Sequence, residues 1–282
     1  MKDYFGYRGQ VCVVTGAASG MGKATAETLV DLGAEVYALD VAEATTPGIK
    51  AFVQVSLGDK ESIDNAFKQL PDRIDKFFGI AGVSGVKTDF NTTFAINFTA
   101  NKYITEEYLI SRIQPGGAIS YISSSGGLRW EKPEIKAELQ TVVESKGWEG
   151  TTDALNALNQ QATPGPLGYV FSKRALNYYV ATIVPVFGEK KIRVNAVLPA
   201  ATQSGLTNEF AAMKGGMDKF LESTGFAGRI AESKEMAEPI VFLNSSMASY
   251  ISGVLLDVDY GLNILPVAGL APDKSSFKLF SR

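Results

Sequence analysis

The sequence predicts an α/β fold, a doubly wound sheet of seven mainly parallel strands with helices on both faces. Three observations predict it. Short apolar, β-branched runs alternate with longer segments of helical period, as in successive βαβ units. Several runs are apolar at nearly every position, which is typical of strands covered on both faces. A glycine-rich turn joins the first run to the first helical segment, and the 282 residues fit one domain of this kind, residues 1–282.

The predicted strands and helices follow one another in chain order. The strands are expected at residues 11–15, 35–40, 51–55, 76–81, 118–122, 192–197 and 254–259. The main helices are expected at residues 22–32, 60–69, 93–113 and 167–187. The connection 41–50 is short and contains Thr45-Thr46-Pro47-Gly48, so no full helix is expected there.

A helical insert of about residues 128–166 precedes the helix at 167–187. Pro133 suits a first helical turn, and an apolar stripe follows it at Ile135, Leu139, Val142 and Val143. Thr152 is expected to cap a second short helix that runs to residue 161. The stripe predicts either the buried face of a packed appendage or a lid over a pocket.

The composition excludes several classes of function. The chain has no histidine and one cysteine, Cys12, which excludes His-dependent hydrolases and His-ligated or multi-thiolate metal sites. We therefore expect no resident metal, and proton transfer must use Tyr, Lys, Asp, Glu or water. The net charge is −3, with 27 basic and 30 acidic side chains, so nucleic acid is not an expected partner.

Nothing in the sequence predicts secretion or insertion into a membrane. Residues 1–10 lack an apolar stretch of signal-peptide length, and no run approaches 18 apolar residues. We expect a cytoplasmic protein without a membrane partner.

The turn after the first strand has the features of a dinucleotide site. Its sequence is Thr15-Gly16-Ala17-Ala18-Ser19-Gly20-Met21-Gly22. Glycines let the backbone turn sharply and approach a pyrophosphate, whose charge the following helix N-terminus stabilises. A tight turn without a ligand is the alternative, because the spacing differs from Gly-x-Gly-x-x-Gly. We expect a Rossmann-like fold with cofactor contacts at Gly16, Ala18, Ser19, Gly20, Met21 and Gly22.

Asp40 is expected to select the cofactor. It ends the second strand 18 residues beyond Gly22, close to the offset at which a carboxylate meets the adenosine ribose hydroxyls. A carboxylate there would repel a 2′-phosphate, and no Arg or Lys lies just after it. The sequence therefore favours NAD, with a solvated Asp at a strand end as the alternative.

Tyr169 and Lys173 stand four residues apart in the helix predicted at 167–187, on one helical face. An ammonium near a phenol favours the phenolate and lowers its pKa. Ser123, Ser124 and Ser125 follow the fifth strand, at the edge where open α/β sheets bind ligands. Each feature is common by itself, since Tyr-x-x-x-Lys arises by chance and serines are ordinary turn residues.

In combination, these residues resemble the short-chain dehydrogenase/reductase (SDR) family over nearly the whole chain. Thr15 to Gly22 is similar to the family's Thr-Gly-x-x-x-Gly-x-Gly loop, and Ile122-Ser123-Ser124 with Tyr169-x-x-x-Lys173 is similar to its active site. The alignment makes Ser124 the expected catalytic serine, with Ser123 and Ser125 as alternatives. Asn97 matches the helix asparagine of the family's catalytic tetrad; an exposed or locally bonded Asn is the alternative.

The resemblance extends the cofactor site but also departs from the family pattern. The family's Asn-Asn-Ala-Gly is Gly79-Ile80-Ala81-Gly82 here, its acidic residue after the third strand is Ser56, and its Pro-Gly is Pro199-Ala200. These changes weaken the assignment at single positions and leave the catalytic set intact. The further contacts that the resemblance implies are Val41, Ser56, Leu57, Ala81, Gly82, Tyr169, Lys173, Pro199, Thr202 and Ser204.

The resemblance implies reversible hydride transfer between a secondary alcohol and a nicotinamide. Tyr169 would be the general base or acid, and Lys173 would lower its pKa and hold the ribose. Ser124 would donate to the substrate oxygen, and Asn97 would hold a water that relays protons to Lys173. The short connection 41–50 and the long insert are similar to the bacterial 3α-hydroxysteroid dehydrogenase/carbonyl reductase branch.

A loop at residues 203–229 is expected to contact the substrate or simply to pack on the body. It carries Leu206, Phe210, Met213, Met217, Phe220, Leu221 and Phe226, and such side chains would suit a bulky, flat, apolar ring system. The prediction is an NAD-dependent enzyme for a hydroxysteroid, a terpenoid alcohol or a similar cyclic alcohol or ketone. The alternatives are a general carbonyl or sugar-alcohol reductase, and a non-catalytic NAD-binding scaffold or redox sensor.

The resemblance also implies a homo-oligomer, since family members associate partly through the helix that carries Tyr and Lys. The insert enters beside that helix, so a homodimer is expected before a homotetramer. The tail at residues 262–282 is apolar in its first half and is expected to cover either a pocket or a neighbour.

Overall fold

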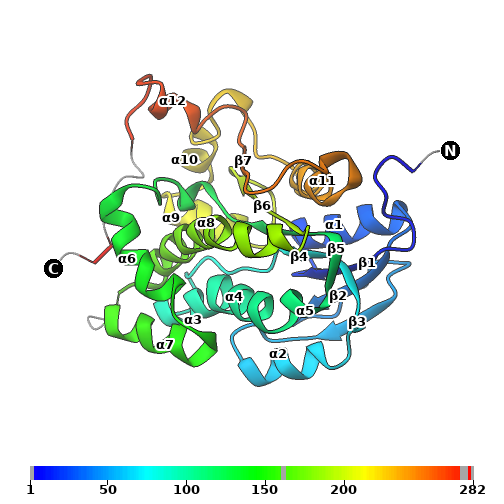
Figure 1. Cartoon of the computed structure of the whole chain (residues 1–282). Helices are drawn as coiled ribbons and strands as arrows, with labels where there is room; N and C mark the ends of the chain where they lie inside the picture. The colour runs from blue at the N-terminus through cyan, green and yellow to red at the C-terminus, as the bar shows by residue number, and fades with distance from the viewer. Residues whose placement is uncertain (1–2, 160–162, 274–278, 281–282) are drawn as a thin grey trace.

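Seven strands form one parallel sheet in the order β3-β2-β1-β4-β5-β6-β7, with helices on both faces (Figure 1). The computed structural model describes residues 3–159, 163–273 and 279–280. The strands are β1 (Val11–Thr15), β2 (Glu35–Asp40), β3 (Ala51–Gln54), β4 (Ile74–Gly79), β5 (Ile113–Ile122), β6 (Arg193–Pro199) and β7 (Leu255–Val258). The strand order reverses between β1 and β4, which opens a crevice at their carboxyl ends.

The helical elements fill the connections between these strands. The α-helices are α1 (Gly20–Asp31), α2 (Lys60–Phe67), α3 (Phe90–Phe94), α4 (Ala100–Ile104), α5 (Ile110–Arg112), α6 (Pro133–Val143), α7 (Gly147–Leu158), α8 (Gly165–Glu189), α9 (Thr207–Met213), α10 (Met217–Glu222), α11 (Ser233–Asn244) and α12 (Ile264–Val267). Two π-helical turns are η1 (Ala95–Thr99) and η2 (Thr105–Leu109), and three 3₁₀ turns are η3 (Ser125–Gly127), η4 (Gly225–Ala227) and η5 (Ser246–Ala248). In the described ranges, no helix is long and apolar enough to cross a membrane.

The predicted sheet is confirmed, with shifts at the strand ends. All seven predicted strands are present, and every pairing is parallel. Strand β5 begins at Ile113, earlier than the predicted start at residue 118, so the preceding helical segment ends at Arg112. No helix lies between β2 and β3 in residues 41–50, all of which are described, as the turn residues there predicted.

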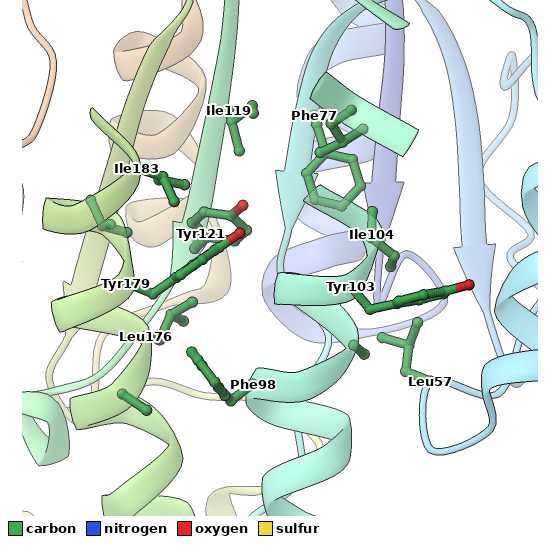
Figure 2. Close-up of a cluster of buried hydrophobic side chains, with 14 of the residues drawn as sticks. Leu57, Phe77, Phe98, Tyr103, Ile104, Ile119, Tyr121, Leu176, Tyr179 and Ile183 are labelled. Carbon is green, nitrogen blue, oxygen red and sulfur yellow. The ribbon is translucent and has the colours of Figure 1, made fainter. Parts of the chain in front are cut away.

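The core lies in two layers, one on each face of the sheet. On one face α1 and α11 pack together over β1, with Val14, Ala26, Leu29 and Ile240 fully buried. On the other face α8 and the helical segment 90–112 cover β4 and β5. Figure 2 shows Phe77, Ile119 and Tyr121 of the sheet facing Phe98 and Ile104 on one side, and Leu176, Tyr179 and Ile183 on the other. This packing fixes α8 relative to the carboxyl ends of the strands.

The insert is a packed appendage of this second face. The four stripe residues Ile135, Leu139, Val142 and Val143 are buried, α6 packs on α8, and α7 packs on α3, α4 and η1. Thr152 is not a helix cap, because α7 begins earlier, at Gly147, and the Thr152 hydroxyl donates to the Trp148 carbonyl at 2.9 Å inside the helix. Helix α7 ends at Leu158, and the predicted end at residue 161 lies outside the described residues.

The described part of the tail returns to this insert. Asp273 forms ion pairs with Arg129 at 2.9 Å and with Lys132 at 3.4 Å. Further along, the backbone amides of Leu279 and Phe280 donate to the Glu138 carboxylate of α6 at 3.2 and 3.1 Å. The tail therefore crosses the insert of its own chain.

The ring of Phe280 closes this contact. It meets Phe171 of α8 edge to face with ring centroids 5.1 Å apart, and Phe90 of α3 at 5.8 Å. The tail thus adds an apolar wedge between α3 and α8.

We predict that Phe280→Ala lowers the free energy of unfolding by about 1–2 kcal/mol, because the wedge is lost and its site fills only partly. Thermal denaturation should show a fall of about 2–6 °C. Tyr250→Ala is the matched control, since Tyr250 is fully exposed and its removal should not change the midpoint. Equal midpoints for both variants would contradict the docking of the tail.

Candidate active site

The glycine turn is built so that backbone comes close to backbone. Gly16 has φ +73°, and a Cβ there would lie 2.8 Å from the backbone of Ala81. A Cβ on Gly22 would lie 2.0 Å from the Gly16 carbonyl oxygen. Side chains are therefore excluded at both positions, which brings the start of α1 against the ends of β1 and β4.

The N-terminus of α1 follows this turn without a side-chain cap. Ser19 is the N-cap residue, and its side chain makes no capping hydrogen bond. The first backbone N–H groups of this 12-residue helix therefore remain without a side-chain acceptor. A close backbone cradle and free N–H donors are what a dinucleotide pyrophosphate requires, so the residues fit a nicotinamide dinucleotide.

Asp40 is fixed beside this turn. One carboxylate oxygen accepts from the Ala18 backbone amide at 2.9 Å, and the other accepts from the Ala42 amide at 3.1 Å. Val41 follows with an exposed side chain. The carboxylate is thus held at the end of β2, next to the glycine turn.

The structure places the other predicted cofactor positions in different surroundings. Gly82 lies beside Asn97 and Lys173, and Ser204 lies against Gly20, where a Cβ would be 3.3 Å from the Ser204 Cβ. Pro199 ends β6, and Thr202 follows it. In contrast, Ser56 is exposed after β3, and the Leu57 side chain is buried in the core, so only the backbone of Leu57 can face a ligand.

Ser124 and Tyr169 meet at the carboxyl end of β5. The Ser124 hydroxyl lies beside the Tyr169 ring, since a Cβ on Gly126 would be 3.5 Å from both Ser124 Oγ and Tyr169 Cε1, and it accepts from the Gly126 backbone amide at 3.0 Å. The Ser123 hydroxyl instead donates to the Lys173 carbonyl at 3.3 Å, and Ser125 begins the 3₁₀ turn η3. Of the three serines, Ser124 is the one whose hydroxyl is placed against Tyr169.

Lys173 lies about one helical turn after Tyr169 in α8 and is almost completely buried. Its Nζ is 5.6 Å from the centroid of the Tyr169 ring and donates to the Ile122 carbonyl at 2.8 Å. Burial lowers the pKa of Lys173 to about 8, because an ammonium is poorly solvated there.

Burial also acts on Tyr169. It raises the pKa of Tyr169, and the nearby Ser124 hydroxyl offsets this only in part. Desolvation therefore controls both groups.

Asn97 joins two sides of the site from the π-helical turn η1. Its Oδ1 accepts from the Val83 amide at 2.8 Å, and its Nδ2 donates to the Val83 carbonyl at 3.0 Å and to the Ser172 hydroxyl at 3.2 Å. It is fully buried, so the exposed alternative is excluded. The loop after β4 is thereby tied to α8, one residue before Lys173.

The structure explains why Gly79 departs from the family pattern. A Cβ at Gly79 would lie 2.6 Å from both Asn101 Oδ1 and Tyr121 Cδ1. Asn101 Nδ2 donates to the Asn97 carbonyl at 3.0 Å, so an amide from the helical segment fills this space. Sequence reasoning missed Asn101, although its spacing of four from Asn97 was a usable signal.

Phe210 is the aromatic residue of the loop 203–229 that contacts Tyr169. Its ring meets the Tyr169 ring edge to face, with centroids 5.2 Å apart. Phe220 of α10 is buried, whereas Met213, Met217, Leu221 and Phe226 are partly or largely exposed. Phe220 therefore packs on the body of the protein, and Phe210 lies against the tyrosine expected to be catalytic. In the part of the chain that the structure describes, no cluster of His, Cys, Asp or Glu suits a metal ion.

Comparison with known proteins assigns the family. Residues 10–133 match the family described as short chain dehydrogenase, and residues 150–263 match the one described as Enoyl-(Acyl carrier protein) reductase. The chain is 33% identical to the coniferyl-alcohol dehydrogenase of Pseudomonas sp. (strain HR199 / DSM 7063), over 89% of this chain and 95% of that protein. The chain therefore belongs to the short-chain dehydrogenase/reductase family of nicotinamide-dependent oxidoreductases.

More distant relatives include the branch that the sequence resembles. The 3-alpha-hydroxysteroid dehydrogenase/carbonyl reductase of Comamonas testosteroni is 24% identical over 90% of this chain and 96% of that protein. The crystal structure of a 3-alpha-hydroxysteroid dehydrogenase from Pseudomonas sp. B-0831 complexed with NADH has the same fold. Its TM-score is 0.74 at 23% identity, over 92% of this chain and 99% of that one.

We predict that Lys173→Met raises the free energy of unfolding at pH 7 by about 1–2 kcal/mol, because a buried ammonium is replaced by an apolar chain. The folded-state pKa near 8 lies below the ordinary 10.5, so the unfolded chain binds more protons between these values. The native protein should therefore gain stability above pH 8, and the difference between the two proteins should shrink. Urea unfolding of both proteins at pH 7 and pH 9.5 measures this difference in the free energy of unfolding. A difference that is the same at both pH values would contradict the lowered pKa.

We predict that Gly79→Ala lowers the free energy of unfolding by about 1–3 kcal/mol, because the new methyl group meets Asn101 and Tyr121. Adding Asn101→Ala should recover part of the loss, since it relieves one of the two contacts. Gly188→Ala in α8 is the control, because nothing lies within 4 Å of a Cβ there. Urea unfolding that gives additive losses for Gly79→Ala and Asn101→Ala would contradict this account.

Proposed function

We propose that the protein is an NAD(H)-dependent dehydrogenase/reductase that interconverts an alcohol and a carbonyl on a bulky, flat, ring-bearing apolar substrate. One observation carries the proposal. The side chains of Ser124 and Tyr169 lie beside each other at the carboxyl end of β5, with buried Lys173 5.6 Å from the Tyr169 ring centroid and Phe210 against that ring. Two adjacent hydroxyl groups can bind one substrate oxygen and stabilise the charge that develops on it.

In the oxidation direction Tyr169 takes the proton from the substrate hydroxyl while Ser124 donates to the same oxygen. The nicotinamide, when bound, supplies the hydride acceptor. Lys173 holds positive charge near the forming phenolate, and its low pKa lets it also release a proton near neutral pH. Asn97 keeps the loop after β4 against α8, and we assign to it the holding of a water that relays protons to Lys173.

Asp40 supports NAD over NADP. Its carboxylate is held by the Ala18 and Ala42 amides at the end of β2, where a 2′-phosphate would meet negative charge. We assign the pyrophosphate to the turn from Gly16 to Gly22. The nicotinamide ring is assigned to the space between Gly82, Pro199, Thr202 and Ser204.

The loop 203–229 supports a flat apolar substrate. Phe210 presents a ring beside Tyr169, and Met213 and Met217 add adaptable apolar surface. A hydroxysteroid or terpenoid alcohol fits this surface. The relative at 33% identity is a coniferyl-alcohol dehydrogenase, so coniferyl alcohol, an aryl-bearing alcohol, is the first compound to test.

We further propose a cytoplasmic homodimer. The insert packs on α8 and α4, and the described tail packs on the insert and α8. These segments cover the outer surface through which a second pair of subunits would associate. Light scattering that shows a tetramer would contradict this.

The test measures formation of NADH or NADPH when the protein is given NAD or NADP together with an alcohol. The alcohols are coniferyl alcohol, a 3α-hydroxysteroid, a terpenoid alcohol and a polyol. We expect turnover of a ring-bearing alcohol with NAD, and a fall of about 10²–10⁴-fold in kcat for Tyr169→Phe. Asp40→Ser should raise kcat/KM with NADP, because the repulsion of a 2′-phosphate is removed.

The other outcomes are equally informative. Turnover of polyols alone would favour a sugar-alcohol reductase. Tight NADH binding without turnover of any compound would favour a non-catalytic scaffold.

A further inference from the structure

A carboxylate of the loop 203–229 connects this loop to the opposite side of the site. Glu209 of α9 forms an ion pair with Lys87 at 2.7 Å and accepts a hydrogen bond from the Ser84 hydroxyl. Both partners belong to the loop after β4, which also carries Gly82 and Val83. The contact therefore spans the crevice at the carboxyl edge of the sheet.

The two contacts of Glu209 differ in their exposure to water. The Lys87 side chain is 81% exposed, so its attraction to Glu209 is screened. Ser84 is buried, at 1% relative exposure, and the Glu209 side chain is 15% exposed. The hydrogen bond from Ser84 is therefore screened less by solvent than the ion pair with Lys87, and it is charge-assisted.

The residue after Glu209 is the one that touches Tyr169. Phe210 lies edge to face on the Tyr169 ring at 5.2 Å. Because α9 has only seven residues, a bond at Glu209 sets the position of Phe210 directly.

The two ends of α9 differ. Before it, the Thr207 hydroxyl accepts from the Ser204 amide at 2.7 Å, next to Gly20. After it, Gly215 and Gly216 have φ of +90° and +121°, which other residues rarely adopt. The helix is thus attached at its start and joined to α10 through two glycines, and the bond at Glu209 adds a contact between its middle and the loop after β4.

We propose that Glu209 is a positioning residue that latches α9 to Ser84 and so holds Phe210 against Tyr169 over the reacting centre. Glu209 acts through Phe210 and does not itself touch the reacting atoms. The effect on turnover rests on the proposed function, whereas the attachment of α9 does not.

The attachment is tested by hydrogen–deuterium exchange of peptides covering α9, on the protein alone. We expect Glu209→Ala and Ser84→Ala each to speed exchange in residues 208–213 about five- to tenfold, as loss of one charged hydrogen bond implies. The double variant should exchange no faster than either single variant, because both remove the same contact. Lys87→Met should change the rate less than twofold.

The kinetic consequence is tested with whichever alcohol the protein turns over. We expect Glu209→Ala to raise the substrate KM about fivefold with kcat within twofold, because the contact stabilises bound substrate and transition state alike. Glu209→Gln, which retains an acceptor for Ser84, should restore much of the difference. Glu222→Ala, at an exposed glutamate of α10 in the same loop, is the matched control and should behave as the native protein.

These experiments separate the two proposals. Faster exchange of α9 in a protein without any turnover would retain the latch and overturn the proposed function. Normal turnover with unchanged exchange and unchanged KM in Glu209→Ala and Ser84→Ala would retain the function and overturn the latch.

Discussion

The amide of Asn97 is the link on which the geometry of the site depends. The loop after β4 carries Gly82, and helix α8 carries Tyr169 and Lys173. Asn97 bonds to both backbone groups of Val83 and to Ser172, so it fixes the separation of this loop and this helix. A π-helical turn allows this, because its extra residue turns a side chain out of the regular helical register.

Much of the fold could be predicted from the sequence because it depends on local patterns. Apolar runs defined the strands, and the spacing of the glycines marked the turn where a Cβ at Gly16 would strike Ala81. The stripe from Ile135 to Val143 defined α6 and its buried face. In contrast, the early start of α7 depends on tertiary packing, so the Thr152 cap was wrong.

The sequence predicted which residue types form the candidate site, but it did not predict the pKa values of those residues. Spacing brought Tyr169 and Lys173 to one helical face, but it could not reveal which way the ammonium points. The depth of burial dominates both pKa values, and it depends on strands far away in the sequence. The same holds for Asn101, whose role is visible only once Gly79 and Tyr121 lie beside it.

The docking of Phe280 has a consequence for the order of folding. Its ring completes a cluster with Phe90 and Phe171, so the cluster joins segments separated by most of the chain. Contacts of such large sequence separation form late, since closing a long loop costs entropy before the contact repays it. During synthesis, α3 and α8 can therefore pack on each other, with Phe90 against Phe171, before the C-terminal segment has left the ribosome. A nascent chain at that stage would expose its aromatic side chains to chaperones.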